Sequence, residues 1–102
     1  MADFSLTIVT PEGRVFEGEA ESVSAVGVVG SLGVLANHAP MICALKDGAV
    51  TVHGNETLHY AASGGTLEVR PDKAVVLLLD YAHPCDSAEE ASRKAQELID
   101  IL

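Results

Sequence analysis

Apolar residues recur at every second position in short runs along most of this 102-residue chain. Near the start, Phe4, Leu6 and Ile8 follow this two-residue period, which is that of a β-strand with one buried face. Residues 10–13 (Thr-Pro-Glu-Gly) then supply turn chemistry. Similar runs, separated by Gly, Pro or Asn, continue to Asp80. The pattern predicts a mainly β domain that opens with a hairpin.

A second hairpin is predicted around residues 54–56, and the length of its turn fixes its register. A two-residue turn would place Val52 opposite Thr57. A three-residue loop places Val52 opposite Leu58 instead, which keeps the apolar residues of both strands on one face. We therefore predict the longer loop.

A third hairpin is predicted where residues 66–69 return as residues 74–79 through a turn that contains Pro71, because proline presets the backbone angle φ that such turns require. The Gly64-Gly65 pair before it is typical of a bulge or a tight bend.

After Pro84 the spacing of apolar residues changes from two to three and four, which is the period of an amphipathic helix. The segment Asp86-Ser87-Ala88-Glu89 resembles a capping box that begins this helix. The sequence thus predicts a β-sandwich domain over residues 1–84 and a short C-terminal helix within residues 85–102. The predicted apolar stripe comprises Ala88, Ala91, Ala95, Leu98 and Leu102.

Charge and composition exclude several classes of function. The formal net charge of −9 would repel phosphate backbones, so no nucleic-acid ligand is expected. No secretory signal is recognised at the start of the sequence. Residues 22–45 contain no Asp, Glu, Lys or Arg, yet glycines, serines and Pro40 interrupt them too often for a membrane helix. Cys43 and Cys85 are expected to be free thiols in an intracellular protein.

No constellation for catalysis or for cofactor binding stands out in the sequence. The four histidines and two cysteines do not form a pair at zinc-ligand spacing, so no metal site is expected. The Ser63-Gly64-Gly65 segment lacks the pattern of a nucleophile turn. Glycines 27, 30 and 33 match neither a dinucleotide fingerprint nor a phosphate loop. We expect a non-enzymatic protein without a cofactor. Because its apolar content is high, some apolar side chains are expected to form a surface that binds a partner.

Residues 30–45 (GSLGVLANHAPMICAL) resemble the G-x-x-G-[VIL]-L-x-x-H-A-P-L stretch of ATP synthase epsilon subunits. Three further segments match that family in the same order, namely residues 6–13, 45–48 and 63–69. The resemblance covers residues 4 to about 80. It implies a ten-stranded β-sandwich that binds the gamma subunit of the central stalk and stands on the c-ring. The implied role is to couple proton or sodium flow to rotation, at the cytoplasmic face of a bacterial membrane and without insertion into it.

The resemblance also implies which residues contact these subunits. They fall in the uncharged run 22–45, and a surface that is desolvated by a partner is expected to lack charge. For His38 an alternative is a histidine that bonds the backbone, and Pro40 is expected to set the direction of the chain. The implied interface residues are Ser31, Leu32, Gly33, Val34, His38, Ala39, Pro40 and Met41.

The sequence departs from the family pattern in three places. Ser31 stands where many relatives have Glu, and Ala36-Asn37 replaces a frequent Pro-Gly. At the C-terminus, Glu89-Glu90-Ala91-Ser92-Arg93-Lys94 keeps an Arg but not the hydrophobic-Asp pair of the family's ATP-binding motif. Only one helix is predicted there, so we expect no ATP site and little or no inhibition of ATP hydrolysis. Alternative functions are a free-standing β-sandwich adaptor or, with less support, a binder of a small ligand or a metal.

Overall fold

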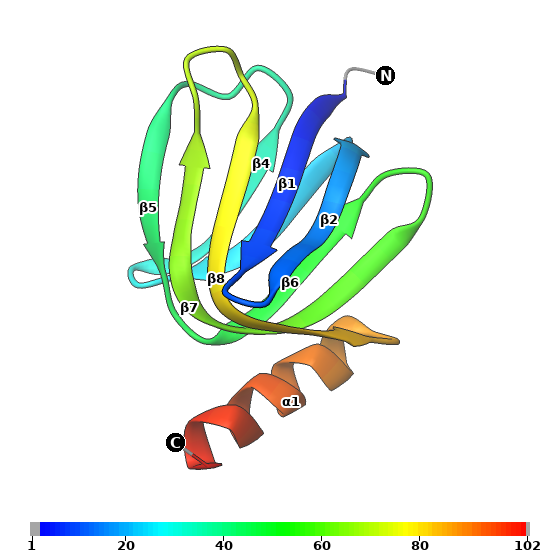
Figure 1. The fold of residues 1–102 in the computed structure, drawn as a ribbon, viewed down its shortest axis with the longest axis vertical. Coiled ribbons are helices and arrows are strands. Elements are labelled where there is room, and N and C mark those ends of the chain that lie inside the picture. Colours follow the sequence, from blue (N-terminus) through cyan, green and yellow to red (C-terminus); the bar gives the residue numbers. More distant parts are fainter. Residues whose placement is uncertain (1–2, 102) are drawn as a thin grey trace.

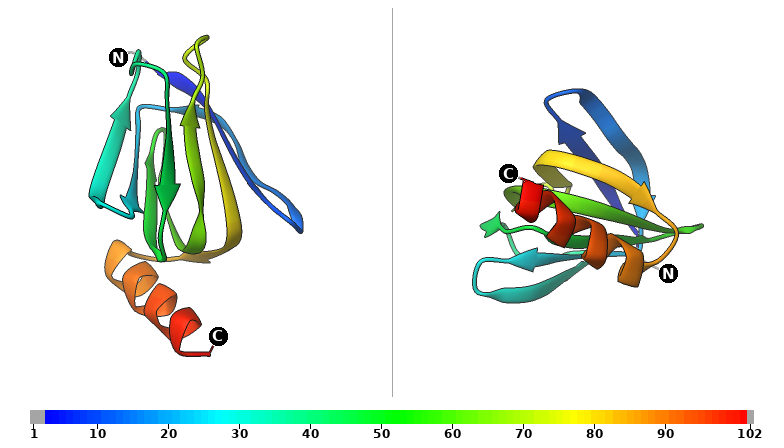
Figure 2. Two further views of the ribbon diagram at one scale, coloured as in Figure 1. Left: turned by 90° about the vertical axis from the view of Figure 1, so that its left-hand side faces the viewer. Right: turned by 90° about the horizontal axis from the view of Figure 1, so that it is seen from below.

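The computed structural model describes residues 3–101, with side-chain burial as far as Glu97. Its β-strands form a two-layered body, and one helix lies across one end of it (Figures 1 and 2). The elements in chain order are β1 (Phe4–Thr10), β2 (Gly13–Ala20), β3 (Ser22–Gly27), β4 (Gly30–Leu35), β5 (Met41–Leu45), β6 (Gly48–His53), β7 (Thr57–Val69), β8 (Val75–Cys85) and α1 (Ala88–Ile101).

Two long strands, β7 and β8, pass through both layers. The second half of β7 pairs with β5 and its first half with β6, while β8 pairs with β7 along almost its whole length. One layer therefore has the order β2-β1-β8-β7-β5, and the other has the order β4-β3-β6-β7-β8. Residues 3–101 form eight strands. The ten strands that we expected result only when β7 and β8 are each counted once in each layer.

The bend that carries β7 from one layer to the other lies at Gly64-Gly65, as the glycine pair predicted. Gly65 has φ +140°, and a Cβ atom at this position would overlap the carbonyl oxygen of Leu78 on β8. Only glycine gives both this backbone angle and this close approach of two strands. The Gly64 N–H donates to the Asp47 carboxylate at 2.9 Å, which holds the bend on its outer side.

All three predicted hairpins are present. β1 pairs with β2 across the turn at Pro11-Glu12. In the second hairpin Val52 lies opposite Leu58, so the prediction of a three-residue loop is confirmed. In the third hairpin β7 returns as β8, and Lys73 in its loop has a positive φ of 75°.

The core lies between the two layers and is built from the inward positions of the strands. These positions alternate along each strand, as expected for a sheet with one buried face. The largest fully buried side chains are Leu6, Ile8, Leu67, Leu77, Val23, Val34, Val52, Val69 and Val75. These side chains identify the inner face of each strand, so the opposite face is the one that a partner can contact.

Helix α1 packs on the outer face of β6 and β7, at the end of the sandwich seen at the bottom of Figure 1. Ala91 and Ala95 are buried, and Ala61 of β7 is buried without belonging to the core cluster between the layers. Small side chains let the helix approach the sheet closely. Ala88 of the predicted stripe is exposed. The Leu98 side chain and Leu102 lie outside the described residues.

The helix cap is one residue further along the chain than predicted. The Ser87 hydroxyl accepts from the Glu90 backbone N–H at 3.1 Å, and the Ser87 carbonyl accepts from the Ala91 N–H at 3.0 Å. Ser87 is therefore the N-cap, and Glu90 rather than Glu89 occupies the third helical position.

Candidate functional site

The interface residues expected from the sequence occupy one edge of the sandwich. Ser31–Val34 lie on β4, residues 38–40 form most of the loop that follows it, and Met41 begins β5. Ser31 lies near the start of β4, whereas Pro40 follows the end of β4, so the two groups lie toward opposite ends of this strand.

The expected interface residues differ in burial, because alternate residues of a strand face outward or toward the core. Ser31 and Gly33 are exposed, whereas Val34 is completely buried opposite Val23 in the core. Leu32 and Met41 are half-buried and pack against the core. In this structure the Val34 side chain is thus not available to a partner.

His38 is held by the backbone of its own loop. Its Nδ1 atom lies 2.7 Å from the Ala39 carbonyl oxygen, which requires the proton on Nδ1. The His38 carbonyl oxygen accepts from the Lys73 ammonium at 3.4 Å, which links the loop to the β7–β8 turn. Asn37 just before it has φ 66°. These contacts correspond to the alternative of a backbone-bonded histidine, and they leave Ala39 and Pro40 exposed.

Four exposed apolar residues lie in the uncharged run 22–45, outside the set that the resemblance implied. Val28 and Val29 form the turn between β3 and β4 and are 60% and 97% exposed. Leu35 ends β4 with 67% exposure, and Ile42 on β5 is 73% exposed. The absence of charge was the sequence signal for all four. It did not show which members of the run face outward.

The pairing of the strands shows that one of these residues, Ile42, belongs to a larger surface. Ile42 lies opposite Glu68 on β7, and Glu68 lies opposite Val76 on β8. The next outward row runs from Ala44 through Thr66 and Leu78 to Val9 on β1. Residues opposite one another share a face of the sheet. We name the resulting patch the outer apolar face and define it as Val9, Ile42, Ala44, Val76 and Leu78.

One charged residue, Glu68, lies within this face between Ile42 and Val76, and the other charged groups named here border it. Arg70 lies 3.8 Å from Glu68, and Arg14 on β2 lies 2.8 Å from Glu17. The Arg14 pair is exposed on both sides, so it contributes at most about 1 kcal/mol. A partner on the outer apolar face would meet apolar side chains on both sides of the Glu68 carboxylate, which lies beside Arg70, and further charged groups at the rim.

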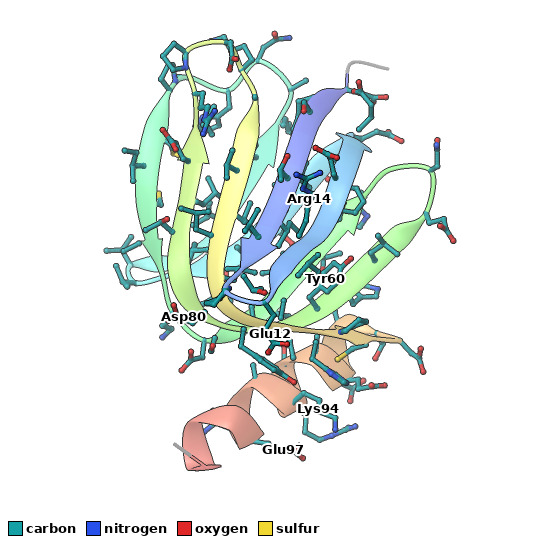
Figure 3. All side chains as sticks on the ribbon, in the orientation of Figure 1. Glu12, Arg14, Tyr60, Asp80, Lys94 and Glu97 are labelled. Carbon is teal, nitrogen blue, oxygen red and sulfur yellow. The ribbon has the colours of Figure 1, made fainter. Side chains whose placement is uncertain are left out.

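A surface hollow of about 320 Å³ is lined by Glu12, Arg14 and Asp80, labelled in Figure 3, and Arg14 is already paired with Glu17. Among the described residues, no three acidic, histidine or cysteine side chains converge as metal ligands. Lys94 is exposed on α1 (Figure 3).

Two groups beside the helix and the core have raised pKa values. Burial raises the pKa of the Cys85 thiol, and the nearby Glu90 carboxylate of α1 adds to this effect. Burial also raises the pKa of Tyr60. Cys85 and Cys43 are both free, as expected. A thiol with a raised pKa is a poor nucleophile, so Cys85 has no sign of catalytic activation.

None of the helical segments in residues 3–101 has the length and apolar character needed to cross a membrane.

Comparison with known proteins gives a consistent result. Residues 3–83 match the family described as ATP synthase, Delta/Epsilon chain, beta-sandwich domain. The ATP synthase epsilon chain of Anoxybacillus flavithermus is 41% identical over 105 residues, covering 94% of this chain and 78% of the relative. That of Bacillus cytotoxicus is 42% identical over 102 residues, covering 95% of this chain and 77% of the relative.

Two solved structures share the fold at low sequence identity. A chain of the Euglena gracilis mitochondrial ATP synthase, described as OSCP/F1/c-ring, aligns with TM-score 0.78 at 23% identity, covering 99% of this chain and 66% of that chain. A chain of the Tetrahymena thermophila enzyme, described as central stalk/c-ring, aligns with TM-score 0.71 at 13% identity, covering 96% of this chain and 91% of that chain.

Proposed function

Because this chain belongs to the ATP synthase delta/epsilon family, as an epsilon-type and non-catalytic subunit of the central stalk, we propose that it binds the gamma subunit and the c-ring. In this role it passes the rotation of the ring to the stalk, which couples ion translocation to ATP synthesis. It acts as a peripheral component at the cytoplasmic face of a bacterial membrane.

The observation that carries this proposal is the exposure of apolar residues in an uncharged part of the surface. Val29 is 97% exposed and Ile42 is 73% exposed, and no charged residue occurs between residues 22 and 45. Exposed apolar side chains of this kind, when they are contiguous, mark protein interfaces. Two separate surfaces, the outer apolar face and the β4 edge with its Val28-Val29 turn, suit a subunit with two partners.

Helix α1 supports a structural role for the C-terminal segment. Its buried residues Ala91 and Ala95 pack it against β6 and β7. We therefore propose little or no inhibition of ATP hydrolysis by this helix. The comparison is between enzyme reconstituted with the full chain and enzyme reconstituted with a chain that ends at Pro84. Equal hydrolysis rates are expected, and a several-fold higher rate with the shorter chain would contradict the proposal.

The test of the main function is co-purification of the gamma and c subunits with the tagged full-length chain. Ile42→Asp places a charge on the most exposed large side chain of the outer apolar face, on β5, and Asn55→Asp adds the same charge in the exposed β6–β7 loop as a control. We expect Ile42→Asp to weaken assembly by about 1–3 kcal/mol, which is the usual cost of an unsatisfied buried polar group, and Asn55→Asp to leave it unchanged. Recovery of one unrelated partner instead of gamma and c would favour the free-standing adaptor.

A further inference from the structure

The free edges of the sheet are not equally protected. An edge strand presents unpaired N–H and C=O groups, which other strands can bind unless charges, proline or a short length prevent it. β2 ends one layer and carries Arg14, Glu17 and Glu19. The part of β8 beyond its pairing with β1 contains Asp80 and Pro84. These two edges are protected.

The edge of β5 is also restricted. Its second side is bonded to the β3 region at Ala44 and Leu45, and Pro40 precedes the short remainder. β4, the other end of the strand order, has none of these protections. It contains no charged residue and no proline, and its register with β3 is unbroken. Both views in Figure 2 place it at the rim of the molecule, with no strand beyond it.

The orientation of the β4 backbone follows from its pairing. The Val26 carbonyl oxygen accepts from the Lys46 N–H at 3.0 Å, so the backbone groups of Val26 point away from β4. Ser31 lies opposite Val26, and the two residues of such a pair both direct their N–H and C=O outward. The alternation then gives Gly33 and Leu35 the same orientation. All three residues are exposed.

We propose that β4 accepts an extended, uncharged segment of a partner protein as an added strand, bound through the backbone groups of Ser31, Gly33 and Leu35. The proposal rests on the proposed function, because β4 belongs to the interface expected there. Main-chain hydrogen bonds provide the affinity in such strand addition, and side-chain pockets provide the specificity. Ser31 has a small side chain and Gly33 has none, which allows a partner strand to approach closely.

Charge identifies the kind of partner. A second copy of this chain would bring another net charge of −9 to the same edge, and this repulsion opposes self-association. The strand that fits β4 is uncharged, like β4 itself, and belongs to a protein that is neutral or basic around it.

The direct test is residue-resolved hydrogen exchange in the free chain and in its complex with the reconstituted gamma subunit and c-ring. Strand addition should slow exchange at the amides of Ser31, Gly33 and Leu35 by about tenfold or more. The amides of Leu32 and Val34 face β3 and should be protected in both states. If the complex forms but the three outward amides exchange as in the free chain, strand addition is wrong and the proposed function stands. If no complex forms, the proposed function itself fails.

Two variants at one position isolate the backbone donor. Gly33→Pro removes the outward N–H without removing a bond to β3, while Gly33→Ala keeps it, and an added Cβ atom meets only the Val23 carbonyl oxygen at 4.0 Å. We expect assembly with the proline variant to be about tenfold weaker than with the alanine variant. A thermal melt of each variant verifies that it folds. Equal assembly by two folded variants would refute the proposal, as would a dimer of the free chain with its outward amides protected.

Discussion

Substitutions at the adjacent residues Val34 and Leu35 distinguish an effect on stability from an effect on assembly, because Val34 is fully buried and Leu35 is 67% exposed. Val34→Asp loses the burial of a valine, which is about 1.5–3 kcal/mol. It also places a carboxylate opposite Val23 in the core, where an uncompensated charge costs about 3–5 kcal/mol. Their sum is comparable with the whole stability of a small domain, about 5–15 kcal/mol. We therefore expect Val34→Asp to be unfolded or severely destabilised.

Leu35→Asp is the matched substitution at the next position. Only about a third of the Leu35 side chain is covered, so the lost burial is about 0.5–1 kcal/mol. We expect a folded protein that assembles less well, since Leu35 ends the β4 edge. Urea denaturation followed by circular dichroism measures stability, and co-purification with gamma and c measures assembly. A cooperative transition for Val34→Asp close to that of the unmodified chain, or an unfolded Leu35→Asp, would refute the reasoning.

Three further substitutions test the fold. Gly65→Ala should destabilise the protein by about 3 kcal/mol or more, measured by urea denaturation, because the new Cβ would overlap the Leu78 carbonyl oxygen at a positive φ. A change below about 1 kcal/mol would contradict the close approach of β7 and β8 at this bend. Ser87→Ala should cost about 1 kcal/mol by removing the acceptor for the Glu90 N–H, and unchanged helical ellipticity and stability would argue against this cap. Burial raises the pKa of Tyr60, so its contribution to stability is complete below about pH 10 and is lost as the pH rises through the raised pKa. Tyr60→Phe should therefore reduce the loss of unfolding free energy at alkaline pH, measured by urea denaturation. An equal loss in the variant and the unmodified chain would refute the role of Tyr60.

Local patterns were sufficient to predict the hairpins. Alternation along β6 and β7 and the length of one loop fixed the pairing of Val52 with Leu58. The glycine pair at 64–65 marked the bend of β7 because its physical cause, a positive φ at close approach, is local. Helix α1 was predicted from its period, and its cap was displaced by one residue because both Asp86 and Ser87 are good capping residues.

Long-range pairing could not be predicted from these patterns. β1 pairs in parallel with the first half of β8, and Leu6 lies opposite Val75. No turn joins these strands, so their register depends on how the two layers close around the core. The outer apolar face depends on this pairing, because it brings Val9 beside Leu78. The strand count was too high for a related reason, since only the three-dimensional structure shows that β7 and β8 each serve both layers.

The expected interface residues show why a contiguous segment is a poor description of a surface on a strand. Successive side chains of a strand point to opposite faces, so a run such as 31–34 divides between partner and core. Val34 belongs to the core, while Leu35, which follows it, is exposed. The backbone N–H and C=O groups alternate in the plane of the sheet with the same period, so those that could bind a partner strand belong to residues 31, 33 and 35. Experiments on this edge therefore need substitutions at these odd-numbered positions, since a change at Val34 reports on folding alone.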